Sequence, residues 1–557
     1  MGGTTSPKAT QPDLGPNVVI FDPSMPSESI QNRLDSIFAQ QEKNQFGDER
    51  YAVLFTPGTY FNDVNVGFYT QVLGLGSTPD AVTINGAVHV EADWFPPNNA
   101  TQNFWRGAEN LSVNPAEGAD RWAVSQASPY RRMHVRGDLQ LDDGGWSSGG
   151  WISDTKIDGQ VRSGSQQQWI SRDSEFGSWC GSNWNMVFLG VHGAPTGTFP
   201  SPPYTTIDGT PVVREKPFLY VDDGDYRIFV PALRTATAGV TWANGPAPGT
   251  SLPIGQFHVT KPGTTAAEMN AALAAGKNLL VTPGVYHLDQ TVQVTRPGTV
   301  VLGLGIATLV PDRGITAMDV ADVDGVKVAG LLIDAGTTNS DTLMRVGQPG
   351  SRADHAADPT SLHDLYFRVG GAVAGKATTS LVVNSNNVIG DHMWIWRADH
   401  AADGGYVGWD INTADTGLVV NGADVTTYGL FVEHYQKTQV VWNGEGGRTY
   451  FFQNEMPYDV PDQAGWMDGS AKGYSAYRVS PEVTSHEAWG LGSYCFFSSN
   501  PSVVAARAFE APETPYVRFH GMVTVSLNHQ GAIQHVINDA GDPTPDGTKP
   551  VNLVSYP

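Results

Sequence analysis

Short apolar runs rich in β-branched and aromatic residues alternate with turns of glycine, asparagine and aspartate along most of the chain. Two stretches depart from this pattern, because residues 27–41 (SESIQNRLDSIFAQQ) and 265–276 (TAAEMNAALAAG) carry apolar residues at helical spacing and predict amphipathic helices. Each is followed by the same motif, since YAVLFTPGTY…LGLG at 51–76 returns as KNLLVTPGVY…LGLG at 277–305. One architectural unit therefore occurs twice.

A shorter repeat of 22 residues runs through the second unit, where an asparagine, a tyrosine and a glutamate recur in the pairs Asn421 and Asn443, Tyr428 and Tyr450, and Glu433 and Glu455. The same alignment places Asn384 and Trp396 one repeat earlier, before an inserted loop near Asp399–Ala414. In the first unit, GGWISDTKIDG and QQQWISRDSEFG repeat at a shorter period that aligns Trp151 with Trp169.

Repeats of strands and turns this short, without intervening helices, are typical of a parallel β-helix, in which each coil stacks on the next. A β-propeller or a pair of sandwiches is the alternative, but propeller blades repeat at about 40–45 residues. We therefore predict an all-β fold of two tandem right-handed parallel β-helices, packed side by side, with short capping helices. The predicted boundaries are a flexible leader at 1–16, an N-terminal β-helix domain at 17–230, a linker at 231–256 and a C-terminal β-helix domain at 257–557.

The charge balance narrows the range of partners. Acidic residues outnumber basic ones by 56 to 33, which gives a net charge of −23, and such a surface is expected to repel nucleic acid and anionic membranes. A groove for a polyuronate normally needs cations, so the acidic chain favours a neutral polymer. Fifteen tryptophans and nineteen tyrosines suit packing against sugar rings. We expect a monomer without a cofactor or a metal site.

The chain has no apolar run long enough to cross a bilayer, and its polar start, MGGTTSPKATQPDLGP, does not have the pattern of a signal peptide. We expect a secreted protein whose leader is what remains after a secretion signal is removed. Two cysteines, Cys180 and Cys495, are too few for a disulfide scaffold or a cysteine-based zinc site. They lie in different halves of the chain, and one bridge between the halves remains open.

The repeated glutamates are the strongest candidates for chemistry. One coil apart, Glu433 and Glu455 would stack about 4.8 Å from each other, beside aromatic residues that exclude water. Both effects raise one pKa, and a protonated carboxyl near an aromatic platform is what a glycosidase needs. The alternative is a solvated glutamate ladder on an outer face. We interpret the asparagine column as structural and His434 as a surface or turn residue.

The run GLFVEHYQKTQVVWNGEGGRTYFFQNEMPYD, with SGSQQQW and NWNMVF in the first half, resembles glycoside hydrolase family 55. The resemblance covers nearly the whole chain. It implies two β-helices with a substrate pocket between them, and a β-1,3-glucanase that inverts the anomeric carbon and releases glucose from chain ends. It also implies that Glu455 is the general acid, that Glu433 is the upstream carboxylate, and that Tyr458 lies near the attacking water.

The stretch SGSQQQW resembles the family segment that orients this water, which makes Gln166, Gln167 and Gln168 candidates. Alternation along a strand allows Gln166 and Gln168 one face and Gln167 the other. The family's serine falls on Ser165 or Ser182. Adjacent coils are closer than the 6.5–9.5 Å or so of an inverting pair, so Glu433 is expected to tune the acid and bind sugar.

The leading hypothesis is a secreted exo-β-1,3-glucanase with Trp396, Trp442 and Tyr450 as the aromatic contacts of the substrate. Exo action requires one end of the groove to be blocked, and the inserted loop is the candidate. A polysaccharide lyase or epimerase acting on uronates is the second hypothesis, with DGDYRIF and DVADVDG as calcium-binding candidates. A non-catalytic carbohydrate-binding β-helix is the third.

Overall fold

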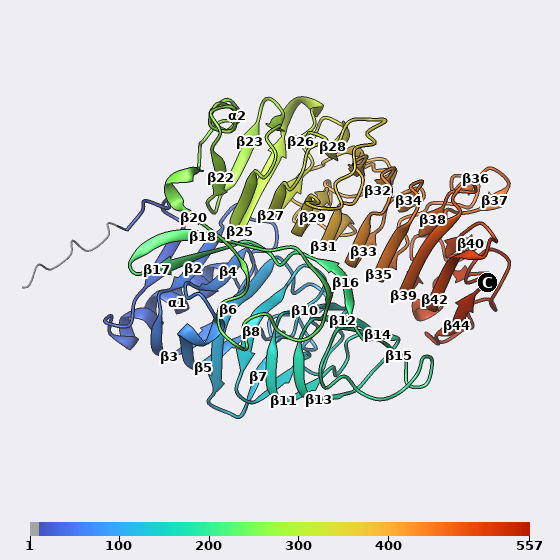
Figure 1. Ribbon diagram of the computed structural model, residues 1–557. Coiled ribbons are helices and arrows are strands. Elements are labelled where there is room, and N and C mark those ends of the chain that lie inside the picture. The colour runs from blue at the N-terminus through green and yellow to red at the C-terminus, as the bar shows by residue number, and fades with distance from the viewer. Residues whose placement is uncertain (1–10) are drawn as a thin grey trace, which may run out of the picture.

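The structure, a computed structural model, describes residues 11–557 and contains two β-helices lying side by side (Figure 1). The first has a parallel main sheet of nine strands in spatial order: β1 (Val18–Phe21), β2 (Tyr51–Phe55), β4 (Thr70–Gly74), β6 (Arg106–Pro115), β8 (Tyr130–Val135), β10 (Gly150–Ser153), β12 (Gln168–Arg172), β14 (Asn185–Leu189) and β15 (Tyr204–Ile207). Six strands complete its coils: β3 (Gly58–Asn65), β5 (Val82–His89), β7 (Ala119–Arg121), β9 (Asp138–Gln140), β11 (Lys156–Arg162) and β13 (Glu175–Cys180).

The second β-helix has a longer main sheet: β21 (Phe257–Val259), β22 (Asn278–Val281), β25 (Val300–Pro311), β27 (Lys327–Asp334), β29 (Ser361–Val369), β31 (Ile389–Arg397), β33 (Thr426–Glu433), β35 (Gly447–Glu455), β39 (Ser485–Cys495), β42 (Tyr516–Ser526) and the antiparallel β44 (Val551–Tyr556), with β23 (Val285–Leu288) beside β25. Its second sheet is parallel: β24 (Val292–Val294), β26 (Met318–Val320), β28 (Ser340–Val346), β30 (Ala377–Val383), β32 (Thr416–Val420), β34 (Val440–Trp442), β38 (Tyr477–Val479) and β41 (Phe509–Glu510). Two small pairs follow: β36 (Met467–Asp468) with β37 (Ala471–Lys472), and β40 (Val504–Ala505) with β43 (Ala532–Ile533). The prediction of parallel β-helices is confirmed.

Both expected helices are present, as α1 (Ser27–Gln41) and α2 (Ala266–Ala274), each before the first full coil of its unit. Thr265 begins α2 with a capping box that it forms with Glu268. No helix among residues 11–557 is both long and apolar enough to cross a membrane. The disulfide bridge that the sequence left open is not formed, since Cys180 is exposed, Cys495 is buried and both are free.

The segment interpreted as a linker, 231–256, is built into antiparallel sheets. Strand β19 (Arg234–Thr237) pairs with β16 (Thr210–Val213), while β20 (Gly249–Pro253) joins the hairpin of β17 (Phe218–Asp222) and β18 (Asp225–Pro231). Of the leader interpreted as flexible, residues 1–10 lie outside the described residues. In the rest of it, Leu14 is buried between the two units, beside apolar side chains of both main sheets.

The strand register confirms the 22-residue repeat. Glu433 pairs with Glu455, and Trp396 pairs with Glu433. The asparagine column is structural, because Asn421 donates to the side chain of Asn384 and Asn443 donates to that of Asn421. In the first β-helix the predicted alignment is wrong by one residue, since Trp151 pairs with Ile170 and Trp169 with Gly150. Neighbouring strand positions face opposite ways, so Trp169 points into its own coil and Trp151 towards the second β-helix.

The second β-helix bends once per coil at residues with left-handed φ: Gly330, Asp364, His392, Gly429, Phe451, Gly490 and Gly521. The bend column faces the first β-helix. At Gly429 a Cβ atom would lie 2.5 Å from the Trp151 ring, so only glycine allows this approach. His392 stacks on the same indole at 5.3 Å between ring centroids. The bends therefore let the two units pack closely along their length.

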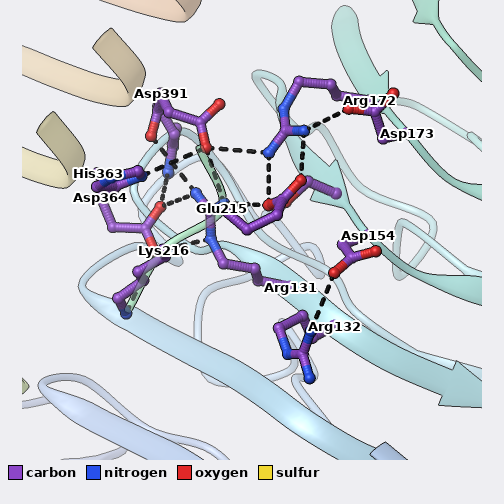
Figure 2. A network of polar contacts seen from close by, with 12 residues as sticks. Arg131, Arg132, Asp154, Arg172, Asp173, Glu215, Lys216, His363, Asp364 and Asp391 are labelled. Carbon is purple, nitrogen blue, oxygen red and sulfur yellow. Dashed lines mark hydrogen bonds and ion pairs between the residues drawn. The ribbon is translucent and has the colours of Figure 1, made fainter. Parts of the chain in front are cut away.

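Buried ion pairs join the two units across this interface (Figure 2). From the first unit, Arg131 binds both carboxylate oxygens of Asp364, at 3.2 and 2.8 Å, and one oxygen of Asp391 at 2.9 Å. Arg172 binds the same oxygen of Asp391 at 3.0 Å and holds both oxygens of Glu215. Although burial opposes ionisation, the charge of Arg131 holds the pKa of Asp364 well below its usual range.

We predict that Arg131→Leu lowers the free energy of unfolding by about 3–5 kcal/mol, because it leaves buried carboxylates with too little positive charge. Urea denaturation measures this change. Arg162→Leu is the control, since Arg162 and Asp138 pair in a partly exposed setting, where the loss should stay below about 1 kcal/mol. Equal losses in the two variants would contradict a special role for the interface network.

Candidate active site

A cavity of about 610 Å³ opens between the two β-helices and is lined by side chains from both. The second unit contributes the carboxylates Glu433 and Glu455, which end strands β33 and β35. Parallel pairing places these residues side by side, so the repeat seen in the sequence becomes a pair of carboxyl groups in the cavity wall. Tyr458 and Trp396 also line the cavity, which brings four of the predicted site residues together.

Glu433 is the more deeply buried carboxyl, with 1% of its surface exposed. Its Oε1 accepts a 3.0 Å hydrogen bond from Nε2 of Gln126, which comes from the first β-helix. Burial, and then the charge of Glu455, raise the pKa of Glu433 well above its ordinary value. Single atoms of Glu433, His434 and Glu455 lie within 4.8 Å of one another, so the two carboxyl groups and the imidazole interact directly.

Two groups face the same oxygen of Glu455. The Tyr458 hydroxyl donates a 2.8 Å hydrogen bond to Oε2, and Nε2 of His434 lies 3.2 Å from that atom. The other ring nitrogen of His434, Nδ1, lies 3.1 Å from the carbonyl oxygen of Met456, to which it donates. This contact fixes the plane of the imidazole and aims Nε2 at the carboxylate.

His434 is buried at a left-handed φ of 69°, so its interpretation as a surface or turn residue is wrong. Burial by itself lowers the pKa of the imidazole, but Asp399 and the contact with Glu455 outweigh it and raise the pKa to about 9. Asp399 lies 3.7 Å from Nε2 of His434. His400 and His434 in turn hold the pKa of Asp399 well below its usual range, against the effect of burial. The inserted loop therefore carries charged groups into the cavity.

The glutamine run divides as strand alternation allows. Gln167 lines the cavity, whereas Gln166 binds the backbone of its own β-helix and Gln168 bonds to the Phe452 carbonyl of the second. Neither Gln166 nor Gln168 reaches the cavity. Ser165 lines it and Ser182 does not.

Gln126 and Ser148 are among the cavity residues from the first β-helix that were not predicted from the sequence. Ser148 lies one coil before Gln167, because the preceding residue Ser147 bridges to Gln166. The correct register would have shown it, and the alignment on Trp169 hid it. Gln126 meets Glu433 across 307 residues of sequence, so no local pattern points to that contact. The Oε1 atoms of Gln126 and Gln167 are buried without a hydrogen-bond partner.

The aromatic predictions are partly corrected. Trp396 lines the cavity and stacks on Trp394 with 4.8 Å between ring centroids. Trp442 lies inside the second β-helix, where its ring packs against Tyr477 and His486. Trp442 is therefore a core residue, because the inward face of β34 is apolar.

Tyr450 also lies away from the cavity. Its ring is stacked between Tyr428 and Trp489, its neighbours in the preceding and following coils. With both faces covered, the ring has no surface for a sugar.

Among residues 11–557, only Glu433, His434 and Glu455 form a group of three carboxylate and imidazole side chains close enough to surround an ion. The raised pKa values of Glu433 and His434 mean that an ion would have to displace protons from both. Away from the cavity, Asp322 and Asp324 of the calcium candidate DVADVDG bind the two ring nitrogens of His355, at 2.7 and 2.6 Å. These two aspartates are thus already paired with a histidine.

Comparison with known proteins gives close matches. A family model described as the LAM55 pectate lyase-like domain matches residues 257–455. An exo-beta-1,3-glucanase of Streptomyces sp. (strain SirexAA-E / ActE) is 58% identical over 550 residues, which cover 98% of this chain and 90% of that protein. The structure of sacteLam55A from Streptomyces sp. SirexAA-E is 57% identical with a TM-score of 0.96, over 98% of this chain and 99% of that chain. A glutamate-to-alanine variant of sacteLam55A in complex with glucose is 56% identical, with the same TM-score and coverage.

We predict that His434 and His486 titrate on opposite sides of an ordinary histidine. The pKa of His434 is raised to about 9, whereas burial lowers that of His486 to about 3. NMR of protein labelled at the histidine ring carbons should show His434 still protonated at pH 8 and His486 neutral at pH 5. The two signals are assigned by their loss in His434→Asn and His486→Gln, and titration of both near pH 6.5 would contradict the described charges.

Proposed function

This chain belongs to glycoside hydrolase family 55, and on that premise we propose that it hydrolyses β-1,3-glucan from a chain end and releases glucose. The observation that carries the proposal is the carboxyl pair Glu433 and Glu455 in a cavity walled by both β-helices, where burial and the charge of Glu455 raise the pKa of Glu433. A carboxylic acid kept protonated near neutral pH is the group that protonates a leaving sugar oxygen. The named relative is an exo-beta-1,3-glucanase, and a variant of the named structure binds glucose.

Glu455 is the general acid in this proposal, and Glu433 is the neighbouring carboxyl whose pKa is raised by burial and by the charge of Glu455. The family resemblance assigns the acid to Glu455, and its larger exposed fraction, 8% against 1%, supports this choice. Tyr458 is bonded to Glu455, so it orients the acid directly. The Trp396 indole forms part of the wall against which a glucosyl ring packs.

The reaction inverts the anomeric carbon. Glu433 and Glu455 approach within 4.8 Å, which leaves no room for water between a base and the sugar, so Glu433 does not act as a simple base. The first β-helix presents Gln126, Ser148 and Gln167 to the same cavity. The unpartnered Oε1 atoms of the two glutamines are free to accept hydrogen bonds from the attacking water.

Exo action requires a wall at one end of the cavity, and the aromatic group around Trp396 is our candidate for it. His400, from the inserted loop, packs against Trp396 at 5.3 Å and Phe104 at 6.3 Å between ring centroids. Trp394 lies 4.7 Å from Phe104 and completes this aromatic wall. A glucan chain then enters with its end first, and one glucose unit is cut off at each step.

The protein acts outside the cell and as a monomer in this proposal. A glucan polymer is too large to cross a membrane, so an enzyme that degrades it must meet it outside. One chain supplies every wall of the cavity described here, so the site needs no second copy.

We predict that Glu455→Gln abolishes nearly all glucose release from laminarin while the fold and laminarin binding remain, because the amide has no proton to donate. The measurement is a time course on laminarin with products separated by size, beside the wild type. Glucose as the first and only product supports exo action, whereas a ladder of larger oligosaccharides contradicts it. A variant that keeps a tenth of the wild-type rate would remove Glu455 from the role of acid.

We predict that Glu433→Gln moves the basic limb of the pH profile of kcat/KM to lower pH. The two carboxylate charges repel each other, as the raised pKa of Glu433 indicates, and the neutral amide removes this repulsion while the His434 cation remains. The profile on laminarin from pH 4 to 9 measures the limb. An unchanged limb would mean that the pair does not share the catalytic proton.

A further inference from the structure

We propose that His434, held by Asp399, is a positioning residue that directs the proton of Glu455 to its Oε1 atom and strengthens Glu455 as an acid. This inference rests on the proposed function, in which Glu455 protonates the leaving sugar oxygen. It gives a role to the buried, protonated His434, which hydrolysis by the carboxyl pair alone does not require.

The hydrogen bonds decide which oxygen carries the proton. Oε2 of Glu455 already receives the Tyr458 hydroxyl and faces Nε2 of His434 at 3.2 Å. A proton on Oε2 would collide with these donors, so the acidic hydrogen lies on Oε1. No described residue donates to Oε1, which leaves that atom for the substrate. Oε2 of Glu455 is therefore held by hydrogen-bond donors, and Oε1 is the oxygen that transfers the proton.

The charge of His434 favours the proton transfer itself. As the O–H bond at Oε1 breaks, the proton goes to the glycosidic oxygen and the electron pair of the C1–O bond leaves with that oxygen. Glu455 becomes negative, and the imidazolium beside Oε2 stabilises this charge more in the transition state than in the ground state. Water adds to C1 and loses one proton, which restores the proton of the carboxyl pair. The net change is one water added across the bond.

Every neighbouring element contributes to the electrostatics at His434. The inserted loop supplies Asp399 and His400, β33 supplies Glu433, β39 supplies Tyr494, and the segment after β35 supplies Tyr458. Arg397, at the end of β31, binds the His434 carbonyl at 3.2 Å and pairs with Asp459. Among these groups, Asp399 is the anion that most favours the charged imidazole.

The inserted loop makes this arrangement available at one coil only. The next repeat, between Glu433 and Glu455, has 22 residues and no such loop. Asp399 lies three residues after Trp396, at the start of the inserted loop, and the matching position of the next coil is Gln436. Neutral and protonated histidine have almost the same volume. The contact with Asp399 therefore changes the charge of His434 and not its packing.

The first test varies the leaving group. His434→Asn should lower kcat/KM on laminaribiose by about 10- to 100-fold, a part of the usual contribution of a general acid. On 2,4-dinitrophenyl β-glucoside, whose leaving group needs no proton, the loss should stay below about threefold. Equal losses on both substrates would show a merely structural role and overturn the proposal.

The second test compares two variants that change opposite charges. His434→Asn removes a cation beside Glu455 and should move the basic limb of kcat/KM to higher pH, whereas Asp399→Asn removes an anion and should move it to lower pH. Shifts in the same direction, or none, would overturn the proposal. Asp399→Asn also answers the question if His434→Asn does not fold. His355→Asn is the matched control, a histidine between two aspartates outside the cavity, and should leave the limb unchanged.

The wild type and Glu455→Gln are measured together with these variants. They distinguish a failure of the proposed function from a failure of the role given to His434. If the wild type releases no product from laminarin, the proposed function fails and the role of His434 fails with it. If the wild type is active and Glu455→Gln is not, uniform losses in His434→Asn overturn only the role given to His434.

Discussion

The docking of one β-helix on the other is the constraint on which the rest of the structure depends, and buried charges fix it. Arg131 and Arg172 hold Asp364 and Asp391 in one relative position, since a slide by one coil would leave both signs unpaired in a dry interface. The same docking brings Gln126 to Glu433, so the cavity owes its two walls to a network that takes no part in the chemistry. Bends at left-handed residues such as Gly429 make the approach close enough for these bonds to form.

Within the cavity, charges of both signs determine which side chains are protonated. Burial and the charge of Glu455 favour the protonated form of Glu433, while Asp399 and the contact with Glu455 favour the protonated form of His434. Neither result needs a metal ion or an unusual side chain. Both depend on poor hydration, because the same groups in water would be an ordinary surface cluster.

The site residues of the second β-helix were largely predictable, because stacked coils of constant length repeat at a constant spacing in the sequence. A constant spacing of 22 residues placed Glu433 beside Glu455, and the 37-residue step placed Trp396 in the same column. The first half was harder, since its coils differ in length, and a slip of one residue at Trp169 concealed Ser148. Gln126 and His434 depend on contacts between distant segments, which spacing does not reveal. Composition also led to the interpretation of residues 231–256 as a linker, whereas glycine and proline there lie between short strands that are paired.

The polar interface also bears on how the chain is made. During synthesis the first β-helix is complete long before its partner, because Asp364 follows Arg131 by 233 residues. Throughout that interval the face that will later be buried is exposed on a nascent protein built of parallel strands, a class that folds slowly. That face carries apolar side chains such as Trp151 and Val187, which favour aggregation while they are exposed, and the arginines Arg131 and Arg172 keep part of it hydrated. Charge at the interface therefore protects the unfinished molecule as well as aligning the finished one.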